Sequence, residues 1–313
     1  MADGSQLEPM SLTLLWIPAT LAAAAAQTAR NATQRKLTDT LGTVGATQVR
    51  FLYGFPFALL FLGVAFALSG EAIPGPTGEF LVFVLVGAVA QIVATALMLA
   101  AMRERSFAVV TALIKTEPVQ VALFGLLLLG DRLTPMTAAA IVIATAGVVL
   151  MSFKPGSIDL TGGGRRPVLF GIVAGGFFAL AAIGFRGAIL ALPSGGFVLR
   201  ATTTVVWGLG LQTALLVAWL TAFNRPALIG SLREWRPSLS AGFLGALASQ
   251  IWFIGFALTN AANVRTLALI EVVFAQVVSH RFLAQGTSAR EIAGMGLIVA
   301  GVALLLFGTS WSV

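Results

Sequence analysis

The sequence predicts an all-α integral membrane protein with ten transmembrane helices, arranged as two inverted five-helix repeats. Three observations support this fold class: the composition, ten long apolar segments, and a repeat that relates the two halves of the chain. Of the 313 residues, 58% are hydrophobic and only 10% are charged, and the mean hydropathy is +0.95. Because a soluble domain carries about 25% charged residues, this composition is typical of a polytopic membrane protein.

Each apolar segment is long enough for a helix of about 20 residues, which is the length that crosses a bilayer. Loop chemistry separates the segments, for example Pro74-Gly75-Pro76 and Gly130-Asp131-Arg132. The ten segments are approximately residues 12–31, 46–68, 79–101, 106–129, 135–153, 168–190, 196–220, 238–260, 264–283 and 288–309.

The second half of the chain repeats the first at a shift of 154 residues. This shift superposes Glu117 on Glu271, Thr134 on Ser288, Gly147 on Gly301 and Leu150 on Leu304. Because each half holds an odd number of segments, the halves have opposite orientations in the membrane. Inverted repeats are a hallmark of secondary transporters, whose substrate site lies near the midplane between the halves. The predicted parts are an N-terminal tail (1–11), a first five-helix repeat (12–153), a linker loop (154–167) and a second five-helix repeat (168–313).

The most informative stretch is residues 113–119, Leu-Ile-Lys-Thr-Glu-Pro-Val, in the middle of an apolar segment. Charge at that depth costs about 2.5–3.5 kcal/mol per residue on insertion scales, so such residues face protein or water-filled space. Pro118 removes a backbone donor and kinks the helix. We predict that Glu117 and Glu271 bind a proton in one state and a cationic group of the substrate in another. The alternative is that each only forms an ion pair, with Lys115 or an arginine, that holds the helices together.

Lys115 lies two residues before Glu117 and therefore points to another face of the helix. We expect it either to approach Glu271 or to attract an anionic group of the substrate. Other candidate substrate- or proton-binding residues lie deep in apolar segments. For the polar ones, hydrogen bonding between helices is the alternative. These further candidates are Asn31, Gln91, Gln250, Trp207 and Trp252.

Four arginines lie near helix ends and occur in similar places in both halves: Arg30, Arg50, Arg186 and Arg200. They are candidates for gating the cavity or steering the substrate at its two mouths. The alternative is that their long side chains extend to the membrane surface.

Several kinds of site are excluded by composition. The chain has no cysteine and one histidine, so it has no thiolate or multi-histidine metal site, and we expect no Ser/His/Asp constellation. It has no glycine-rich phosphate loop followed by Lys-Ser/Thr, so ATP drive within this chain is not expected. We predict no metal, no cofactor and no enzymatic activity. The net charge of +7 lies in short loops beside apolar segments, which indicates membrane topology rather than nucleic-acid binding.

Residues 116–119 (Thr-Glu-Pro-Val), 126–134 (Leu-Leu-Leu-Leu-Gly-Asp-Arg-Leu-Thr) and 146–150 (Ala-Gly-Val-Val-Leu) resemble the EamA-type repeat of the drug/metabolite transporter superfamily. Residues 292–302 resemble the closing helix of the second repeat. The resemblance implies a ten-helix carrier with a central cavity, of a kind that often exports amino acids or other small metabolites. The second half departs from the pattern. It has Glu271-Val272 instead of a Glu-Pro pair, and Gln285-Gly286 where an acidic residue is usual.

Loop charges predict the orientation. Twelve Lys and Arg residues fall on the side of the odd-numbered loops, whereas the other side has only Arg132 and Arg265. Because positive loops stay in the cytoplasm, we predict an inner-membrane protein with both termini outside. The family resemblance implies the opposite, since many relatives have cytoplasmic termini.

Together these features predict a secondary-active transporter that works by alternating access. We expect its substrate to be a small zwitterionic or anionic organic metabolite, with amino acids leading, and the resemblance favours export. Proton coupling, exchange and facilitated diffusion stay open, as do monomer and homodimer. The expected partners are the substrate and the lipid bilayer. The alternatives are a cationic drug efflux carrier and, in another class, a membrane enzyme or a non-transporting receptor or subunit.

Overall fold

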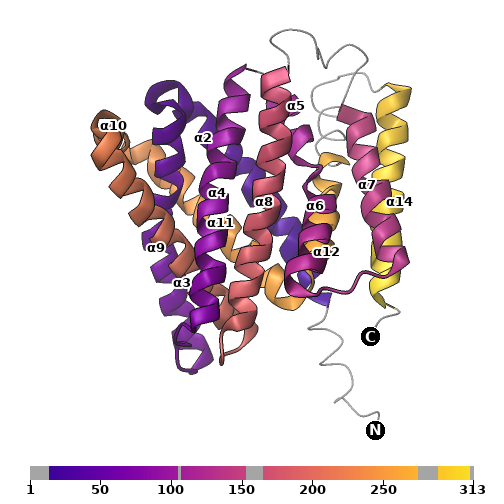
Figure 1. Cartoon of the computed structure of the whole chain (residues 1–313), viewed down its shortest axis with the longest axis horizontal. Helices are drawn as coiled ribbons and strands as arrows, with labels where there is room; N and C mark the ends of the chain where they lie inside the picture. Colours follow the sequence, from indigo (N-terminus) through magenta and orange to yellow (C-terminus); the bar gives the residue numbers. More distant parts are fainter. Residues whose placement is uncertain (1–13, 105–106, 153–164, 274–287, 311–313) are drawn as a thin grey trace.

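The computed structural model describes residues 14–104, 107–152, 165–273 and 288–310. These residues form helices joined by short turns (Figure 1). The helices are α2 (Trp16–Leu52), α3 (Gly54–Ser69), α4 (Gly78–Glu104), α5 (Phe107–Ile114), α6 (Glu117–Phe124), η2 (Gly125–Leu129, a π-helix), α7 (Pro135–Ser152), α8 (Arg165–Ala191), α9 (Phe197–Phe223), α10 (Arg225–Arg233), α11 (Trp235–Leu258), α12 (Ala261–Leu267) and α14 (Ala289–Ser310).

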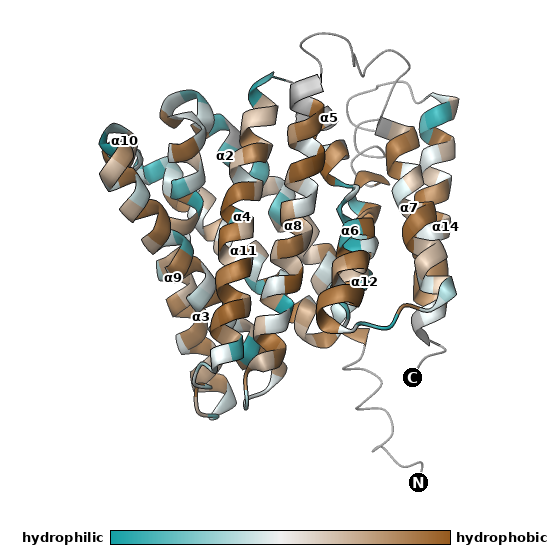
Figure 2. Cartoon of the chain, viewed as in Figure 1, coloured by the Kyte–Doolittle hydropathy of each residue, from teal (hydrophilic) through white to brown (hydrophobic). Residues whose placement is uncertain are grey.

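The helices have the length and surface of membrane spans. Six in the described ranges are long and apolar enough to cross a bilayer, and two shorter ones are apolar. Hydrophobic residues cover the middle of the helices, while hydrophilic residues gather at their ends and in the turns (Figure 2). The predicted class, an all-α multi-pass membrane protein, is therefore confirmed, and the count of ten spans stays a prediction. The six are residues 36–69, 78–104, 168–191, 197–223, 235–258 and 289–308.

The helices pack in pairs that follow a simple rule. Helix α4 packs along α8 and α2 packs along α11, so the third predicted segment meets the sixth and the first meets the eighth. The repeat makes the first segment equivalent to the sixth and the third equivalent to the eighth. Exchanging equivalent segments therefore converts one pair into the other. Three further pairs join equivalent segments: α3 with α9, α6 with α12, and α7 with α14. Other contacts, such as those of α9 with α11 and of α6 with α8, join segments that are not equivalent, and the inverted repeat stays a prediction.

The pair α7–α14 stands at one end of the molecule (Figure 1) and has a close backbone contact. A Cβ atom on Gly147 would lie 2.7 Å from the carbonyl oxygen of Gly294, and one on Gly301 would lie 2.8 Å from that of Ala140. Only glycine allows so close an approach. Both the glycines and their contact partners are 154 residues apart, so the contact has the same periodicity as the sequence repeat.

Some predicted boundaries need correction. The expected loop between the first two segments is wrong, because α2 is helical through residues 32–41 and turns only at Gly42, whose φ is 67°. That conformation favours glycine. The side-chain amide of Gln34 donates to the carbonyl of Ala46 at 2.8 Å and bridges the turn. The predicted tail (1–11) and most of the predicted linker lie outside the described residues, and α8 already begins at Arg165.

Candidate functional site

The candidate site is built where two apolar segments are interrupted. In the first half α5 ends at Ile114, residues 115–116 form a turn, and α6 begins at Glu117. Pro118 explains this break, because it has no N–H to donate to the carbonyl of Ile114. In the second half α12 ends at Leu267, a turn follows, and helical structure resumes at residue 270. Both predicted glutamates therefore lie just after a break.

Two ion pairs join these breaks. Arg265 of α12 pairs with Glu117, with 3.1 Å between Nε and Oε1, and Lys115 pairs with Glu271. Lys115, Glu117 and Arg265 are buried, and the side chain of Glu271 is 17% exposed. The expected approach of Lys115 to Glu271 is thus present. Each acid is neutralised by a cation from the other half of the chain, so both pairs connect the two halves.

Aromatic rings hold Arg265 in place. Its guanidinium carbon lies 4.2 Å from the ring centroid of Trp252 and 5.4 Å from that of Phe256, both on α11. A guanidinium over an aromatic face is attracted by the ring quadrupole. The indole N–H of Trp252 in turn donates to Oε1 of Gln27 at 3.1 Å, which fixes the indole against α2.

A cavity of about 50 Å³ lies beside both ion pairs. This volume holds a few water molecules rather than an organic metabolite. Thr28, one of its lining residues, is exposed. The two carboxylates therefore border a void that is shared by both halves. Its lining is Gln27, Thr28, Arg30, Asn31, Met98, Thr111, Ile114, Lys115, Glu117, Phe178, Arg265 and Glu271.

A second cavity, of about 10 Å³, lies next to the first, because four residues line both: Gln27, Arg30, Phe178 and Arg265. Its remaining lining includes Arg50, Gln91 and Trp252. Five further predicted residues thus line one or both cavities. Asn31 lines the first cavity and Arg30 lines both. The second cavity alone is lined by Arg50, Gln91 and Trp252.

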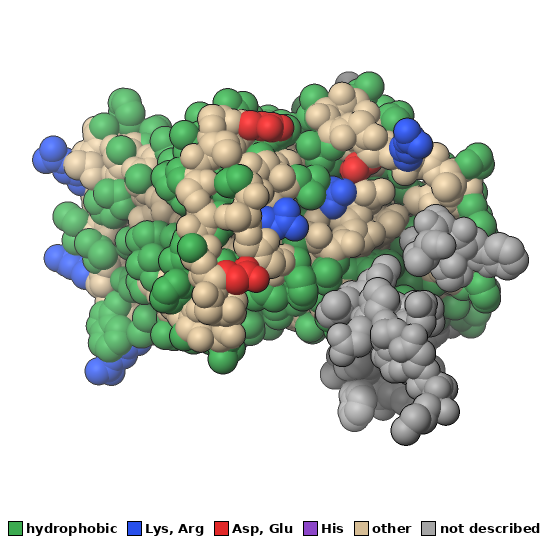
Figure 3. All heavy atoms as spheres, turned by 90° about the horizontal axis from the view of Figure 1, so that it is seen from below, with side chains coloured by type: hydrophobic (Ala, Val, Ile, Leu, Met, Phe, Trp, Pro, Cys, Tyr) green, Lys and Arg blue, Asp and Glu red, His purple; other side chains and the backbone are tan. Residues whose placement is uncertain are grey.

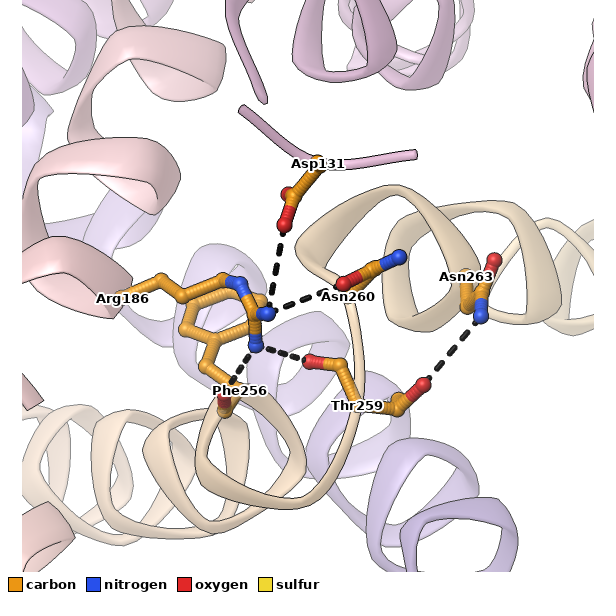
Figure 4. A network of polar contacts seen from close by, with 6 residues as sticks. All are labelled: Asp131, Arg186, Phe256, Thr259, Asn260 and Asn263. Carbon is orange, nitrogen blue, oxygen red and sulfur yellow. Dashed lines mark hydrogen bonds and ion pairs between the residues drawn. The ribbon is translucent and has the colours of Figure 1, made fainter. Parts of the chain in front are cut away.

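Arg186 belongs to a different network. Its guanidinium donates to the carbonyls of Phe256 (2.8 Å) and Thr259 (2.5 Å) and to Oδ1 of Asn260 (2.9 Å), and it pairs with Asp131 at 3.3 Å (Figure 4). Asp131 lies in the turn between η2 and α7, and Asn260 lies between α11 and α12, so the network also joins the halves. Both turns lie in the lower half of Figure 1.

The face seen from below has basic and acidic side chains gathered near its middle, with hydrophobic side chains around them (Figure 3). A role of Arg186 in gating this side stays a prediction.

Three predicted residues lie away from both cavities. The side-chain amide of Gln250 donates to Oγ1 of Thr202 at 2.8 Å. Trp207 packs edge-on against Phe80, with ring centroids 5.9 Å apart. Arg200 is half-buried on α9. Matched depth in the sequence predicts that Gln91 and Gln250 share a site, but the structure does not bring them together.

Arg265 is the main site residue that sequence reasoning missed. Its position near the start of an apolar segment predicts a loop residue, but the structure buries it in α12, 8% exposed. The repeat held a signal: a shift of 154 residues places Arg265 on Thr111, which also lines the first cavity. Gln27, Thr28 and Thr111 are polar lining residues that were also not among the predicted site residues.

Comparison with known proteins agrees with this architecture. Residues 14–153 match the model of the EamA-like transporter family. A crystal structure of another protein is similar in fold, with a TM-score of 0.66, over 94% of this chain and 95% of that one, at 18% sequence identity. Among curated protein sequences, none matches the chain. The match over residues 14–153 places these residues in the drug/metabolite transporter superfamily.

Proposed function

We propose that the protein is a secondary-active transporter that moves a small zwitterionic or anionic organic metabolite by alternating access. One observation carries the proposal: two ion pairs, Glu117–Arg265 and Lys115–Glu271, cross between the halves beside a shared cavity. An amino acid carries the same two kinds of charged group. Its carboxylate can replace Glu117 at Arg265, and its ammonium can replace Lys115 at Glu271.

This exchange supplies a reason for movement. A buried ion pair is costly to break unless a new partner takes the place of the old one. A substrate that supplies both partners releases two connections between the halves at little cost. A ligand shifts a conformational equilibrium by its differential affinity for the two states. The substrate would therefore favour states in which the halves have separated, which also gives the small cavity room to widen.

The two ends of the site support alternating access. On one side the network of Arg186, Asp131 and Asn260 joins the halves, while Thr28, which lines the first cavity, is exposed. Transport would require the network to open and the other mouth to close. The pairing of equivalent helices and the contact at Gly147 and Gly301 support the inverted repeat that makes such exchange of mouths natural.

The remaining details are part of the proposal. Protonation of Glu117 or Glu271 after release of the substrate would give proton coupling, because a protonated carboxyl no longer needs its cation. Export of amino acids or related compounds is the direction that the family resemblance favours. The loop charges support an inner-membrane protein with both termini outside. Since Arg265 is buried, the outer loops hold even less positive charge than the count of loop residues suggests.

The test is uptake of a metabolite panel by purified protein in liposomes. Thermal-shift hits would be followed into transport assays for the wild type, Glu117→Gln, Glu271→Gln and the control Glu79→Gln, an exposed acid at the start of α4. We expect the two site variants to lose at least tenfold in uptake rate and the control to transport normally. Normal transport by both site variants would show that Glu117 and Glu271 do not form the substrate site. Transport of cationic drugs but not amino acids would favour the efflux carrier, and no movement of any compound would favour a receptor or subunit.

A further inference from the structure

Arg30 and Arg50 are buried cations without an acidic partner. Arg30 is 2% exposed and Arg50 is 1% exposed. Among the described residues, no carboxylate lies within ion-pair distance of either guanidinium. An uncompensated charge is expensive in the interior of a membrane protein. Extension of these side chains to the membrane surface would expose their guanidinium groups, so that alternative is wrong for both. Their burial calls for another explanation.

Their hydrogen bonds leave most donors unused. A guanidinium has five N–H donors. Arg30 donates to a single oxygen, Oδ1 of the adjacent Asn31, at 3.2 and 2.7 Å. Arg50 donates to Oγ1 of Thr95 at 2.9 Å, and its buried Nε has no hydrogen-bond partner. Two forked donors with free positions are suited to an oxygen-rich anion.

Both arginines line the same cavity. Arg30 and Arg50 line the second cavity together, although they lie on opposite sides of the turn at Gly42. Gly245 of α11 provides the room for their stems. A Cβ atom there would lie 3.2 Å from Cγ of Arg50 and 3.7 Å from Cδ of Arg30. The absence of a side chain at residue 245 thus lets the two arginines run side by side.

The charges around the two cavities do not balance. Among the described residues that line them, Arg30, Arg50, Lys115 and Arg265 are positive, and only Glu117 and Glu271 are negative. Both acids are already paired with Arg265 and Lys115. The surplus positive charge is therefore located at Arg30 and Arg50, next to the site where the proposed substrate would bind.

We propose that Arg30 and Arg50 form a carboxylate subsite, so that the transported metabolite carries a net negative charge. This inference rests on the proposed function and narrows its substrate class to acidic amino acids and small dicarboxylates. One carboxylate would occupy the Arg30–Arg50 subsite, and the rest of the molecule would reach the crossed ion pairs through the first cavity. Arginine suits this role because its planar fork matches a carboxylate. Neutral zwitterions would leave the surplus charge unmatched.

The experiment compares acids with their near-isosteric amides. Aspartate with asparagine, glutamate with glutamine, and succinate with succinamate would be tested for binding to the purified full-length protein, by calorimetry and thermal shift. We expect at least one acid to bind at least tenfold more tightly than its amide. Arg30→Gln and Arg50→Gln should each reduce that preference at least tenfold. Arg50→Lys should retain part of it, since a positive charge remains. The matched control is Arg200→Gln, a half-buried arginine that lines neither cavity.

The outcomes separate this inference from the proposed function. Equal binding of acids and amides, binding of neutral or cationic compounds alone, or no binding of any acid would overturn the carboxylate subsite. The wild-type comparison decides this even where a glutamine variant fails to fold, which size-exclusion chromatography would reveal. A preference that survives in folded Arg30→Gln and Arg50→Gln would also overturn it. In contrast, liposome transport of a neutral metabolite would overturn only the subsite, and no transport of any compound would overturn the proposed function itself.

Discussion

Arg265 Nε lies 3.1 Å from Glu117 Oε1, and Glu271, six residues after Arg265, pairs with Lys115, two residues before Glu117. The four charges thus form a closed set in which each half of the chain supplies one acid and one cation. Neither half is neutralised from within. Any separation of the halves at this point must therefore break both pairs or replace their partners.

The first prediction concerns the energy of the Glu117–Arg265 pair. Removing one member leaves an uncompensated buried charge, which costs about 3–5 kcal/mol. Glu117→Gln and Arg265→Gln should each destabilise the protein, whereas the double variant should lose much less than the sum of the two. Thermal or chemical denaturation in detergent gives the free energies for this double-mutant cycle. Additive losses would show that the two side chains do not depend on each other.

The second prediction concerns Trp252. Replacement by alanine removes the ring under Arg265 and the hydrogen bond to Gln27, and a cation–π contact is worth about 0.5–2 kcal/mol. We expect Trp252→Ala to weaken substrate binding severalfold and Trp252→Phe to weaken it less, as measured by the Kd of the best ligand. Trp207→Phe, at a position that lines neither cavity, should leave the Kd unchanged. If it weakens binding as much as Trp252→Phe, the assignment of Trp252 to the site is wrong.

The third prediction uses the absence of cysteine from the chain. A single cysteine at Asn263, which is buried beside the Arg186 network and donates to Thr259, reports on that side of the molecule. Arg186→Gln removes the connection to Asp131 and Asn260, so the cysteine should react severalfold faster with a charged thiol reagent. Arg132→Gln, an exposed neighbour of Asp131, is the control. Equal reaction rates in the Arg186→Gln and Arg132→Gln backgrounds would mean that Arg186 does not keep this mouth closed.

The fourth prediction concerns the contact between α7 and α14. Alanine at Gly147 or Gly301 places a Cβ atom against backbone at 2.8 Å or less, and overpacking costs about 1–3 kcal/mol. We expect the two variants to destabilise the protein to a similar extent, because the contact obeys the 154-residue repeat. Gly296→Ala is the control, since a Cβ atom there would have no neighbouring atom within 4 Å. A large difference between the two variants would argue against a symmetric crossing.

The sequence could predict those parts of the site that are visible as local exceptions to an apolar pattern. Glu117, Glu271, Lys115 and Pro118 are such exceptions, and the structure places the acids and the lysine at one cavity. Arg265 was not recognisable, because a charge at the start of an apolar segment resembles a loop residue until the fold shows that α12 is buried. The helix at residues 32–41 was missed for a related reason. Its large apolar residues are only Leu37 and Leu41, which are too few to distinguish a helix from a loop in the sequence.

Both halves have a break just before the site glutamate, but only the break in the first half contains a proline. Pro118 makes the interruption after α5 permanent, since no donor exists for the carbonyl of Ile114. At residues 268–269 each residue keeps its N–H, and the turn is held by short-range bonds, from Leu269 to Thr266 and from Glu271 to Ala268. This turn therefore keeps every donor that a regular helix would need. Proline fixes the break in the first half, whereas the break in the second half could straighten and move Glu271.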